Sequence, residues 1–231
     1  MLDQLPGDAS SQAAAICGDV FEDFSTITVE SDGGLTFEDN VVDASGGVAL
    51  DFEPEGLLVI TANTITSDSG SGMLLNAPQG ATIASNTIYA GAGDGIYVAS
   101  GSGVLITNNA ITAIGGLPIN LAPGVNNGQS APTIASAALD ASGNLTISYS
   151  IPPTLGATYP LTIDFYGQPA AGGPPIYLGS DTYNLNSDGS SPVNTITLSV
   201  NGELQSGDTL FATATDAAGN TSVLSAGFIV M

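Results

Sequence analysis

Four asparagines recur at one fixed interval in the first half of the chain. They are Asn40, Asn63, Asn86 and Asn109, and each lies 23 residues after the one before it. The residues around them repeat in the same phase. A fixed interval of this size is typical of stacked supersecondary units, each of which forms one layer of a repeat architecture.

Apolar side chains keep the same interval and form columns through the units. The columns are Phe37, Ile60, Ile83 and Ile106; Val42, Ile65, Ile88 and Ile111; Leu50, Met73, Ile96 and Ile119; and Phe52, Leu75, Val98 and Leu121. The last two columns are two residues apart, which is the β-strand period, so both point to the same side of a strand. In stacked units, each buried Ile or Leu would contribute about 1.5–3 kcal/mol. These short, glycine-rich, β-branched units predict an all-β parallel β-helix of about four to five coils.

We interpret the asparagine column as a structural ladder. An asparagine at a corner between strands can take a left-handed or bridge conformation, and stacked amides can hydrogen-bond to each other. A polar ligand site is the alternative. A glycine column is interpreted in the same way and predicts a second corner with positive φ. Its members are Gly47, Gly70, Gly93 and Gly116.

Three units carry a family resemblance. Residues 60–65, 83–88 and 106–111, each followed by a glycine-rich turn, resemble right-handed parallel β-helix repeats of large bacterial surface and secreted proteins. In the second half, residues 162–166, 177–179 and 209–222 are similar to the strands and closing hairpin of the immunoglobulin-like module that often follows such repeats. The resemblance implies a bacterial exported architecture. It implies no catalytic residues, because the group is defined by its fold.

Alternating segments in the second half predict half-buried strands of a β-sandwich. Their apolar residues are Leu145, Ile147, Tyr149 and Ile151; Leu161, Ile163 and Phe165; Ile196, Leu198 and Val200; and Leu210, Ala212 and Ala214. Turn signals at 186–189 and 216–220 separate segments, and 228–230 is expected to form a last strand. The predicted organisation is a capping segment at 1–20, a parallel β-helix at 21–121, a connector at 122–130 and an immunoglobulin-like β-sandwich at 131–231.

The first twenty residues differ from the repeats. Residues 10–16 have good helix propensity and predict a short helix that caps the first coil. A segment that docks into a neighbouring subunit is the alternative. Met1 is not followed by a basic and then a long apolar region, so the given sequence predicts no signal peptide. Cys17, the single cysteine, is expected to be a buried and unreactive thiol, because no basic neighbour could lower its pKa.

The chain contains no Lys, Arg or His but has 22 Asp and Glu residues, which gives a formal net charge of −22. Each carboxylate must therefore be solvated, bonded to N–H groups or matched by a cation, so added salt or Ca²⁺ should stabilise the fold. An anionic chain without cationic side chains disfavours nucleic acids and anionic membranes as partners. No apolar run reaches the length of a membrane span. Neutral glycans and protein neighbours remain.

Catalysis must work with carboxylates, hydroxyls, amides and one thiol. Polysaccharide lyases need Arg or Lys, and Ser or Cys nucleophiles need a histidine base. A glycosidase needs two carboxylates about 5–9.5 Å apart. Asp51 and Glu53 should both face solvent from one strand, about 6.6–6.8 Å apart by the strand rise. We expect a solvated acidic face and no enzyme, with a carboxylate-only glycosidase as the alternative.

No cofactor is predicted, although weak Ca²⁺ binding is an alternative. Asp94, within Gly91–Gly95, is similar to a fragment of Ca²⁺-binding glycine-rich repeats, but the nine-residue period of those repeats is missing. A set of four carboxylates is a second candidate for loose Ca²⁺ binding through oxygen ligands. A nonspecific layer of counterions is the simpler interpretation. The set consists of Asp43, Asp51, Glu53 and Glu55.

One outward column predicts a contact surface. It consists of Thr28, Asp51, Leu74, Tyr97 and Asn120. Leu74 and Tyr97, with Asp51 and Glu53 nearby, form a candidate patch for a neutral sugar or a protein neighbour, and ordinary exposed area is the alternative.

We therefore predict a non-catalytic extracellular or cell-surface module with a structural or adhesive function. The β-helix would be a rigid spacer and the sandwich its cap, in a homo-oligomer, fibre or surface-layer subunit. A carbohydrate-binding or carbohydrate-cleaving β-helix protein that uses only carboxylates is the alternative.

Overall fold

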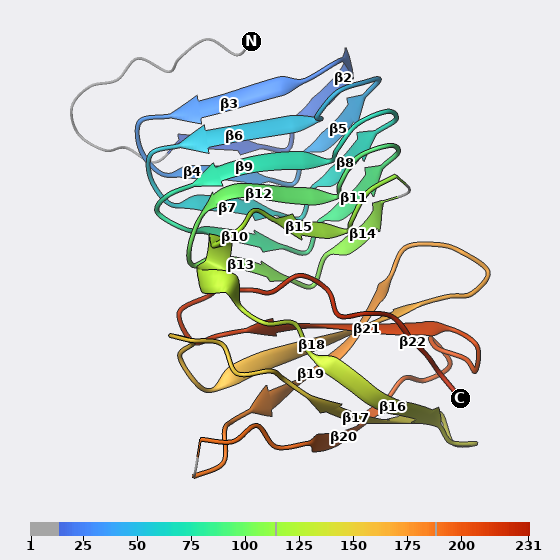
Figure 1. The fold of residues 1–231 in the computed structure, drawn as a ribbon. Coiled ribbons are helices and arrows are strands. Elements are labelled where there is room, and N and C mark those ends of the chain that lie inside the picture. Colours follow the sequence, from blue (N-terminus) through green and yellow to red (C-terminus); the bar gives the residue numbers. More distant parts are fainter. Residues whose placement is uncertain (1–13, 114, 188) are drawn as a thin grey trace. The chain divides into compact units, whose positions relative to one another are not determined.

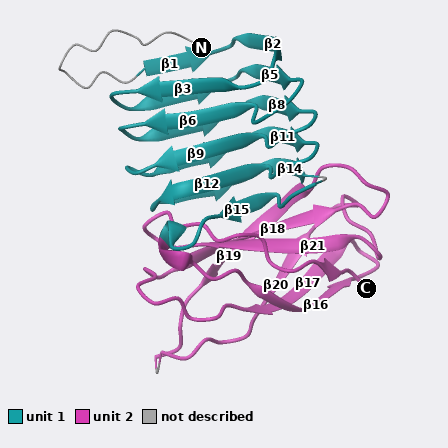
Figure 2. Cartoon of the chain, turned by 45° about the horizontal axis from the view of Figure 1, so that its top comes forward, with its two compact units in different colours: residues 1–126 teal, residues 127–231 magenta. Residues whose placement is uncertain are grey.

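A computed structural model describes residues 14–113, 115–187 and 189–231 of the chain. The chain divides into two units, residues 1–126 and 127–231 (Figure 2). The predicted connector at 122–130 spans this boundary and contains the 3₁₀ helix η1 (Val125–Gly128).

Three parallel sheets of five strands each form the first unit (Figure 1). Each coil adds one strand to each sheet in turn. Sheet A contains β1 (Ala14–Cys17), β4 (Leu35–Glu38), β7 (Leu58–Thr61), β10 (Ala81–Ala84) and β13 (Val104–Thr107). Sheet B contains β2 (Val20–Phe24), β5 (Val41–Ala44), β8 (Thr64–Ser67), β11 (Thr87–Ala90) and β14 (Ala110–Ala113). Sheet C contains β3 (Ile27–Ser31), β6 (Leu50–Pro54), β9 (Met73–Ala77), β12 (Ile96–Gly101) and β15 (Ile119–Leu121).

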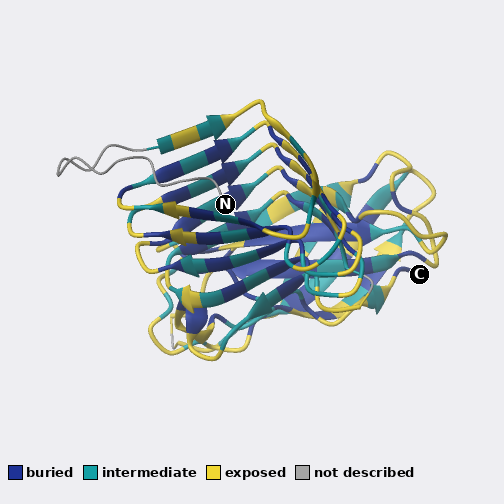
Figure 3. Ribbon diagram, turned by 90° about the horizontal axis from the view of Figure 1, so that it is seen from above, coloured by how far each residue is buried: buried dark blue, intermediate teal, exposed yellow. Residues whose placement is uncertain are grey.

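Like side chains lie above like in this unit, which confirms the predicted parallel β-helix. Ile83 is the register partner of both Ile60 and Ile106, each 23 residues away. The inward columns are buried except at Leu121, which is half-buried in the last coil, and the exposed residues concentrate in the turns (Figure 3). The repeat therefore sets both the register and the core, because a one-residue slip would move every apolar side chain to the outer face.

The first coil is shorter than the others at its start. Ala14 pairs with Leu35, only 21 residues away, and a register shift in β2 shortens the interval to 20 at Phe24, which pairs with Ala44. The 23-residue interval begins at Ile27, which pairs with Leu50, because the turn before Leu50 is three residues longer than the turn before Ile27. The helix predicted at 10–16 is wrong for 14–16, which belong to β1, because pairing with β4 satisfies the backbone groups there. Residues 1–13, the greater part of the predicted capping segment, lie outside the described residues.

Cys17 is exposed, so the prediction of a buried thiol is wrong. Ile16 and Cys17 are consecutive residues of β1 and are the register partners of Phe37 and Glu38. Consecutive side chains of a strand point to opposite faces. Ile16 therefore lies on the face of the buried Phe37, and Cys17 on the outer face with Glu38.

The asparagines form a continuous hydrogen-bond ladder through the buried corner of the coils. Asn63 Oδ1 accepts the backbone N–H of Asn40 at 2.9 Å and its Nδ2–H at 3.1 Å, and Asn63 Nδ2 donates to Asn86 Oδ1 at 2.9 Å. Asn86 makes the same contacts to Asn109. The ladder begins one layer earlier than the sequence pattern suggests, since the N–H of Asp19 donates to Asn40 Oδ1 at 2.9 Å. Aspartate has no amide donor, so the side-chain ladder ends there.

The left-handed residue at this corner is the one before each asparagine. Their φ angles are 56° for Asp39, 58° for Ala62, 59° for Ser85 and 51° for Asn108. None of the four ladder asparagines has a positive φ. The predicted left-handed turn is therefore present, but one residue earlier than expected. Alanine and serine are strained in this conformation, so the surrounding layers must hold them in it.

The glycine column needs a correction. Only Gly47 has the predicted positive φ, at 71°. The other three are required by close stacking. A Cβ on Gly70 would collide with the carbonyl oxygen of Gly47, and one on Gly116 would lie 2.7 Å from the carbonyl oxygen of Gly93. The corners of successive coils thus approach too closely for a side chain.

The second unit, called here the two-sheet unit, contains two antiparallel sheets. Sheet D contains β16 (Thr133–Leu139), β17 (Asn144–Ser150) and β20 (Asn194–Ser199), in that order. Sheet E has the order β19 (Ile176–Tyr183), β18 (Leu161–Gln168), β21 (Thr209–Thr215) and β22 (Phe228–Ile229). The four alternating segments predicted from the sequence correspond to β17, β18, β20 and β21, whereas β16 was not predicted.

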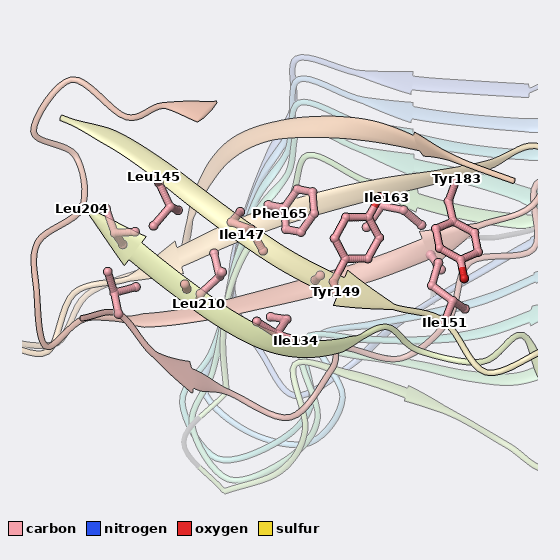
Figure 4. Close-up of a cluster of buried hydrophobic side chains, with 14 of the residues drawn as sticks. Ile134, Leu145, Ile147, Tyr149, Ile151, Ile163, Phe165, Tyr183, Leu204 and Leu210 are labelled. Carbon is pink, nitrogen blue, oxygen red and sulfur yellow. The ribbon is translucent and has the colours of Figure 1, made fainter. Parts of the chain in front are cut away.

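The two sheets share one apolar core (Figure 4). Leu145, Ile147 and Tyr149 come from sheet D, and Ile163 and Phe165 from sheet E; all five are fully buried. The Tyr149 and Phe165 rings meet edge to face at a centroid distance of 5.3 Å. Because apolar residues alternate along both sheets, each sheet buries one face in this core.

Asp216 closes the loop after β21. Its carboxylate accepts N–H groups of Thr158 at 3.2 Å, Ala218 at 2.9 Å and Asn220 at 2.9 Å, together with the Asn220 side-chain amide at 3.0 Å. Burial acts to raise the pKa of this carboxyl, but the hydrogen bonds to the charged form outweigh it and lower the pKa below its usual value. The turn predicted at 216–220 is therefore held by a structural carboxylate.

Candidate functional site

The predicted outward column lies in register on sheet C. Asp51 pairs with Thr28 and Leu74, and Tyr97 pairs with Leu74 and Asn120. These positions alternate with inward residues of β3, β6, β9, β12 and β15, so they share the outer face. All five side chains are half-buried. The structure thus brings Leu74 and Tyr97 side by side on adjacent strands.

A polar column runs beside it on the same face. Glu53 is the register partner of Glu30, and its Oε1 accepts Asn76 Nδ2–H at 3.5 Å. Asn76 Oδ1 accepts the hydroxyl of Ser100 at 3.3 Å, across a register shift in β12. Carboxylates, an amide and a hydroxyl therefore flank the apolar pair, and they could bond to sugar hydroxyls.

Asp51 departs from the expectation that it faces solvent. Its side chain is half-buried, and Oδ1 is inaccessible to water and has no hydrogen-bond partner. Burial, followed by the negative charges of Glu53 and Glu30, raises the pKa of the Asp51 carboxyl above its usual value.

The structure separates the acidic residues that were considered together as loose Ca²⁺ ligands. Asp43 lies on β5 of sheet B, whereas Asp51 and Glu53 lie on β6 of sheet C, and Glu55 follows that strand. Within residues 14–113, 115–187 and 189–231, no three His, Cys, Asp or Glu side chains gather as a metal site.

Asp94 has a structural position. Its Oδ1 accepts the N–H of Leu117 at 2.7 Å, and its Oδ2 accepts Asn120 Nδ2–H at 2.7 Å. Its own N–H donates to Ser71 Oγ at 3.0 Å. Asp94 therefore ties three successive coils together, and through Asn120 it fixes one end of the outward column on sheet C.

The sequence pattern missed two residues at the ends of the stack. The 23-residue interval does not identify Asp19, because Asp19 precedes Asn40 by 21 residues. It does not identify Asn126 either, because the side-chain amide of Asn126 takes the place of a backbone group. Asn126 Oδ1 accepts the N–H of Val104 at 2.9 Å, and Nδ2 donates to the Val104 carbonyl at 2.8 Å. Asn126 is fully buried, and its amide makes the two hydrogen bonds with Val104 that a further strand beside β13 would otherwise make.

No helix among the described residues is both long and apolar enough to cross a membrane. No curated protein matches the chain.

One solved structure with some likeness is the crystal structure of the hypothetical protein PH1083 from Pyrococcus horikoshii OT3. It is 17% identical and covers 41% of this chain and 84% of that one, with a TM-score of 0.28. A similarity of this size supports no conclusion about fold or function.

A family model described as a right handed beta helix region matches residues 25–151. The match covers β3 to β15 of the first unit and continues into β16 and β17 of the second. It agrees with the three stacked parallel sheets and their 23-residue register. The chain belongs to the right-handed β-helix family.

Proposed function

We propose that this protein is a non-catalytic extracellular or cell-surface module that binds neutral glycans through the outer face of sheet C. The observation that carries this proposal is the pairing of Leu74 and Tyr97 on adjacent strands, beside the polar side chains of Glu53 and Asn76 on the same face. An apolar and aromatic platform bordered by hydrogen-bonding groups suits the apolar face and hydroxyl rim of a sugar ring.

Charge favours a neutral ligand. The chain has a net charge of −22 and no cationic side chain, so an anionic polysaccharide would be repelled. Half of the 22 carboxylates lie between Asp19 and Glu55, which places them in the first coils. Leu74 and Tyr97 lie in later coils, where the carboxylates are fewer and a neutral chain could dock.

Rigidity of the platform would assist binding. The asparagine ladder and the Asp94 bonds connect successive coils, so the register of the outward column is held in the free protein. A preorganised site loses little conformational entropy on binding. The same stiffness suits a spacer, and we propose that the two-sheet unit is an immunoglobulin-like module attached to it.

A neutral-glycan array followed by calorimetry tests the proposal. We expect binding by the wild type and at least a tenfold loss in Tyr97→Ala. Tyr89→Ala is the matched control, because Tyr89 is an exposed tyrosine on the outer face of sheet B. Retained binding in Tyr97→Ala, or an equal loss in the control, would contradict the proposed surface.

Carbohydrate cleavage is a second candidate function, favoured by one observation. Asp51 and Glu53 lie two residues apart on β6, so both side chains are on the same face. The pKa of the Asp51 carboxyl is raised, as a general acid requires. If this face is catalytic, incubation with a bound oligosaccharide should release reducing ends, and Asp51→Asn should abolish the release. Binding without any release would leave the non-catalytic proposal standing.

A further inference from the structure

The two-sheet unit has four edge strands, and three of them carry features that limit pairing with another chain. At β16, the N–H of Met231 donates to the Ala137 carbonyl at 3.1 Å, and the Leu139 N–H donates to Met231 at 3.0 Å. β19 contains the charged Asp181, Gly179 with a φ of 140° and a register shift against β18. β22 has only two residues. A covering segment, a charge, an irregularity and a short length are all known protections of sheet edges.

β20 has none of these protections. Its six residues, Asn194–Ser199, pair with β17 without a register shift and include no proline and no charge. Among the described residues, no strand pairs with its other side. A regular, uncharged edge of this kind is a template for an additional strand.

The orientation of the β20 backbone follows from one bond at its end. The N–H of Val200 donates to the Gly143 carbonyl at 3.0 Å, and these residues continue the β17–β20 register. Alternate residues of an antiparallel pair exchange such bonds, so Ile196 and Leu198 direct their N–H and C=O groups toward β17. The intervening residues direct theirs to the open edge. They are Thr195, Thr197 and Ser199.

The open edge is complementary to itself. A two-fold axis through Thr197 would place Thr197 opposite its own copy, Thr195 opposite Ser199, and Ile196 opposite Leu198. Every outward N–H and C=O group of the two strands would then have a partner. Aliphatic residues would meet on the inner face, and hydroxyl residues on the outer face.

The outer face of sheet D already carries rows of hydroxyl contacts that a second copy would extend. Thr146 and Thr197 lie 3.2 Å apart at their hydroxyl oxygens, and Ser148 and Thr195 lie 3.0 Å apart. Cross-strand hydroxyl pairs of this type stabilise sheets. Ile196 and Leu198 are only half-buried in one copy, so a partner strand would cover them.

Charge also selects this surface for contact between copies. The three strands of sheet D contain no Asp or Glu, although the chain carries 22 carboxylates. Two strongly anionic molecules can therefore approach here without placing carboxylates against each other. Their overall repulsion remains, so salt should favour the contact.

We infer that the outer edge of β20 is a self-association surface, at which two copies of this chain join sheet D into one continuous antiparallel sheet. A single strand pair is smaller than a standard interface of about 1,600 Å², so the association is weak and depends on concentration. The surface belongs to a different unit from the sheet C face. Failure of glycan binding would therefore leave this inference intact.

Sedimentation velocity of the full chain tests the inference, over roughly 5 to 500 µM protein in low and high NaCl. The wild type should rise from a 22.8 kDa species toward twice that mass, and more so in high salt. Thr197→Pro removes an N–H that has no partner among the residues that the structure describes, so the fold should persist while association falls at least tenfold. Hydrogen exchange should show slowing at the outward amides only at high concentration.

A pair of charge variants keeps the test decisive if the proline variant does not fold. Thr197→Glu would place two like charges at the two-fold axis and should abolish association. Thr146→Glu adds the same charge to the same face one strand further in, and it should associate as the wild type does. A wild type that stays at 22.8 kDa throughout, or equal effects of the two glutamates, would overturn the inference.

Discussion

Removal of one ladder amide should weaken the β-helix far more than an ordinary surface substitution. The Asn63 side chain accepts from the backbone N–H of Asn40 at 2.9 Å and donates to the carbonyls of Phe37 and Thr61, each at 2.9 Å. In Asn63→Ala, the Asn40 N–H is left buried without its acceptor, and the Phe37 carbonyl loses a donor. Thr61 keeps the N–H of Asp39 at 3.1 Å.

The expected cost follows mainly from the Asn40 N–H, because the Phe37 carbonyl keeps its place in the β4–β7 ladder opposite Ile60. A buried polar group left without its hydrogen bond costs about 1–3 kcal/mol, so the substitution should lower the free energy of unfolding by about that much. A typical domain has about 5–15 kcal/mol in total. The variant should therefore unfold at a clearly lower urea concentration, or fail to fold its middle coils.

Urea denaturation followed by circular dichroism measures this change, and hydrogen exchange assigns it to the β-helix. Asn76→Ala is the matched control, because this amide lies on the outer face of sheet C with side-chain contacts of 3.3 and 3.5 Å. We expect the control to change stability by less than about 0.5 kcal/mol. Equal stabilities of the two variants would refute the role assigned to the ladder.

The remaining predictions concern strain, protonation and salt. Ala62→Gly should stabilise the β-helix by about 0.5–1 kcal/mol, because glycine adopts a φ of 58° without the steric strain that alanine has there. In the same urea assay, the control Ala84→Gly within β10 should destabilise the β-helix by a similar amount. The pKa of the Asp51 carboxyl is raised in the folded protein, so this residue destabilises the fold as the pH rises from about 3.8 through the folded pKa. The melting temperature of Asp51→Asn should therefore equal that of the wild type below this pH range and exceed it at pH 7. NaCl should raise the melting temperature, mainly in the coils that hold residues 19–55, and Ca²⁺ should act similarly until a chelator is added; unchanged melting would refute the cation argument.

Periodicity made the architecture predictable. Residues such as Ile60, Ile83 and Ile106 recur at 23, and within each coil apolar residues recur at two, so only stacked layers bury them all. The outward column through Leu74 and Tyr97 follows from the same register. These predictions succeeded because repeated local patterns determine which residues share a face.

The failures lie where contacts between distant residues override local preference. Ala14–Ile16 have helix propensity but form a strand, because β4 supplies backbone partners. Asp51 was expected in solvent, but its Oδ1 is shielded on the folded sheet. Gly70 is required by the carbonyl of the coil below it and not by its own φ. A propensity describes one residue and its neighbours, and it cannot include groups that approach only after folding.

The sequence by itself determined the repeat, the inward and outward faces, and the complete absence of cationic groups. Tertiary structure alone decided which residue turns the corner, which carboxylate loses water, and which strand edge stays open at β20. The physical reason is that periodicity is carried by covalent order along the chain. Strain, desolvation and unpaired backbone groups depend on atoms that come together only when the layers and sheets assemble.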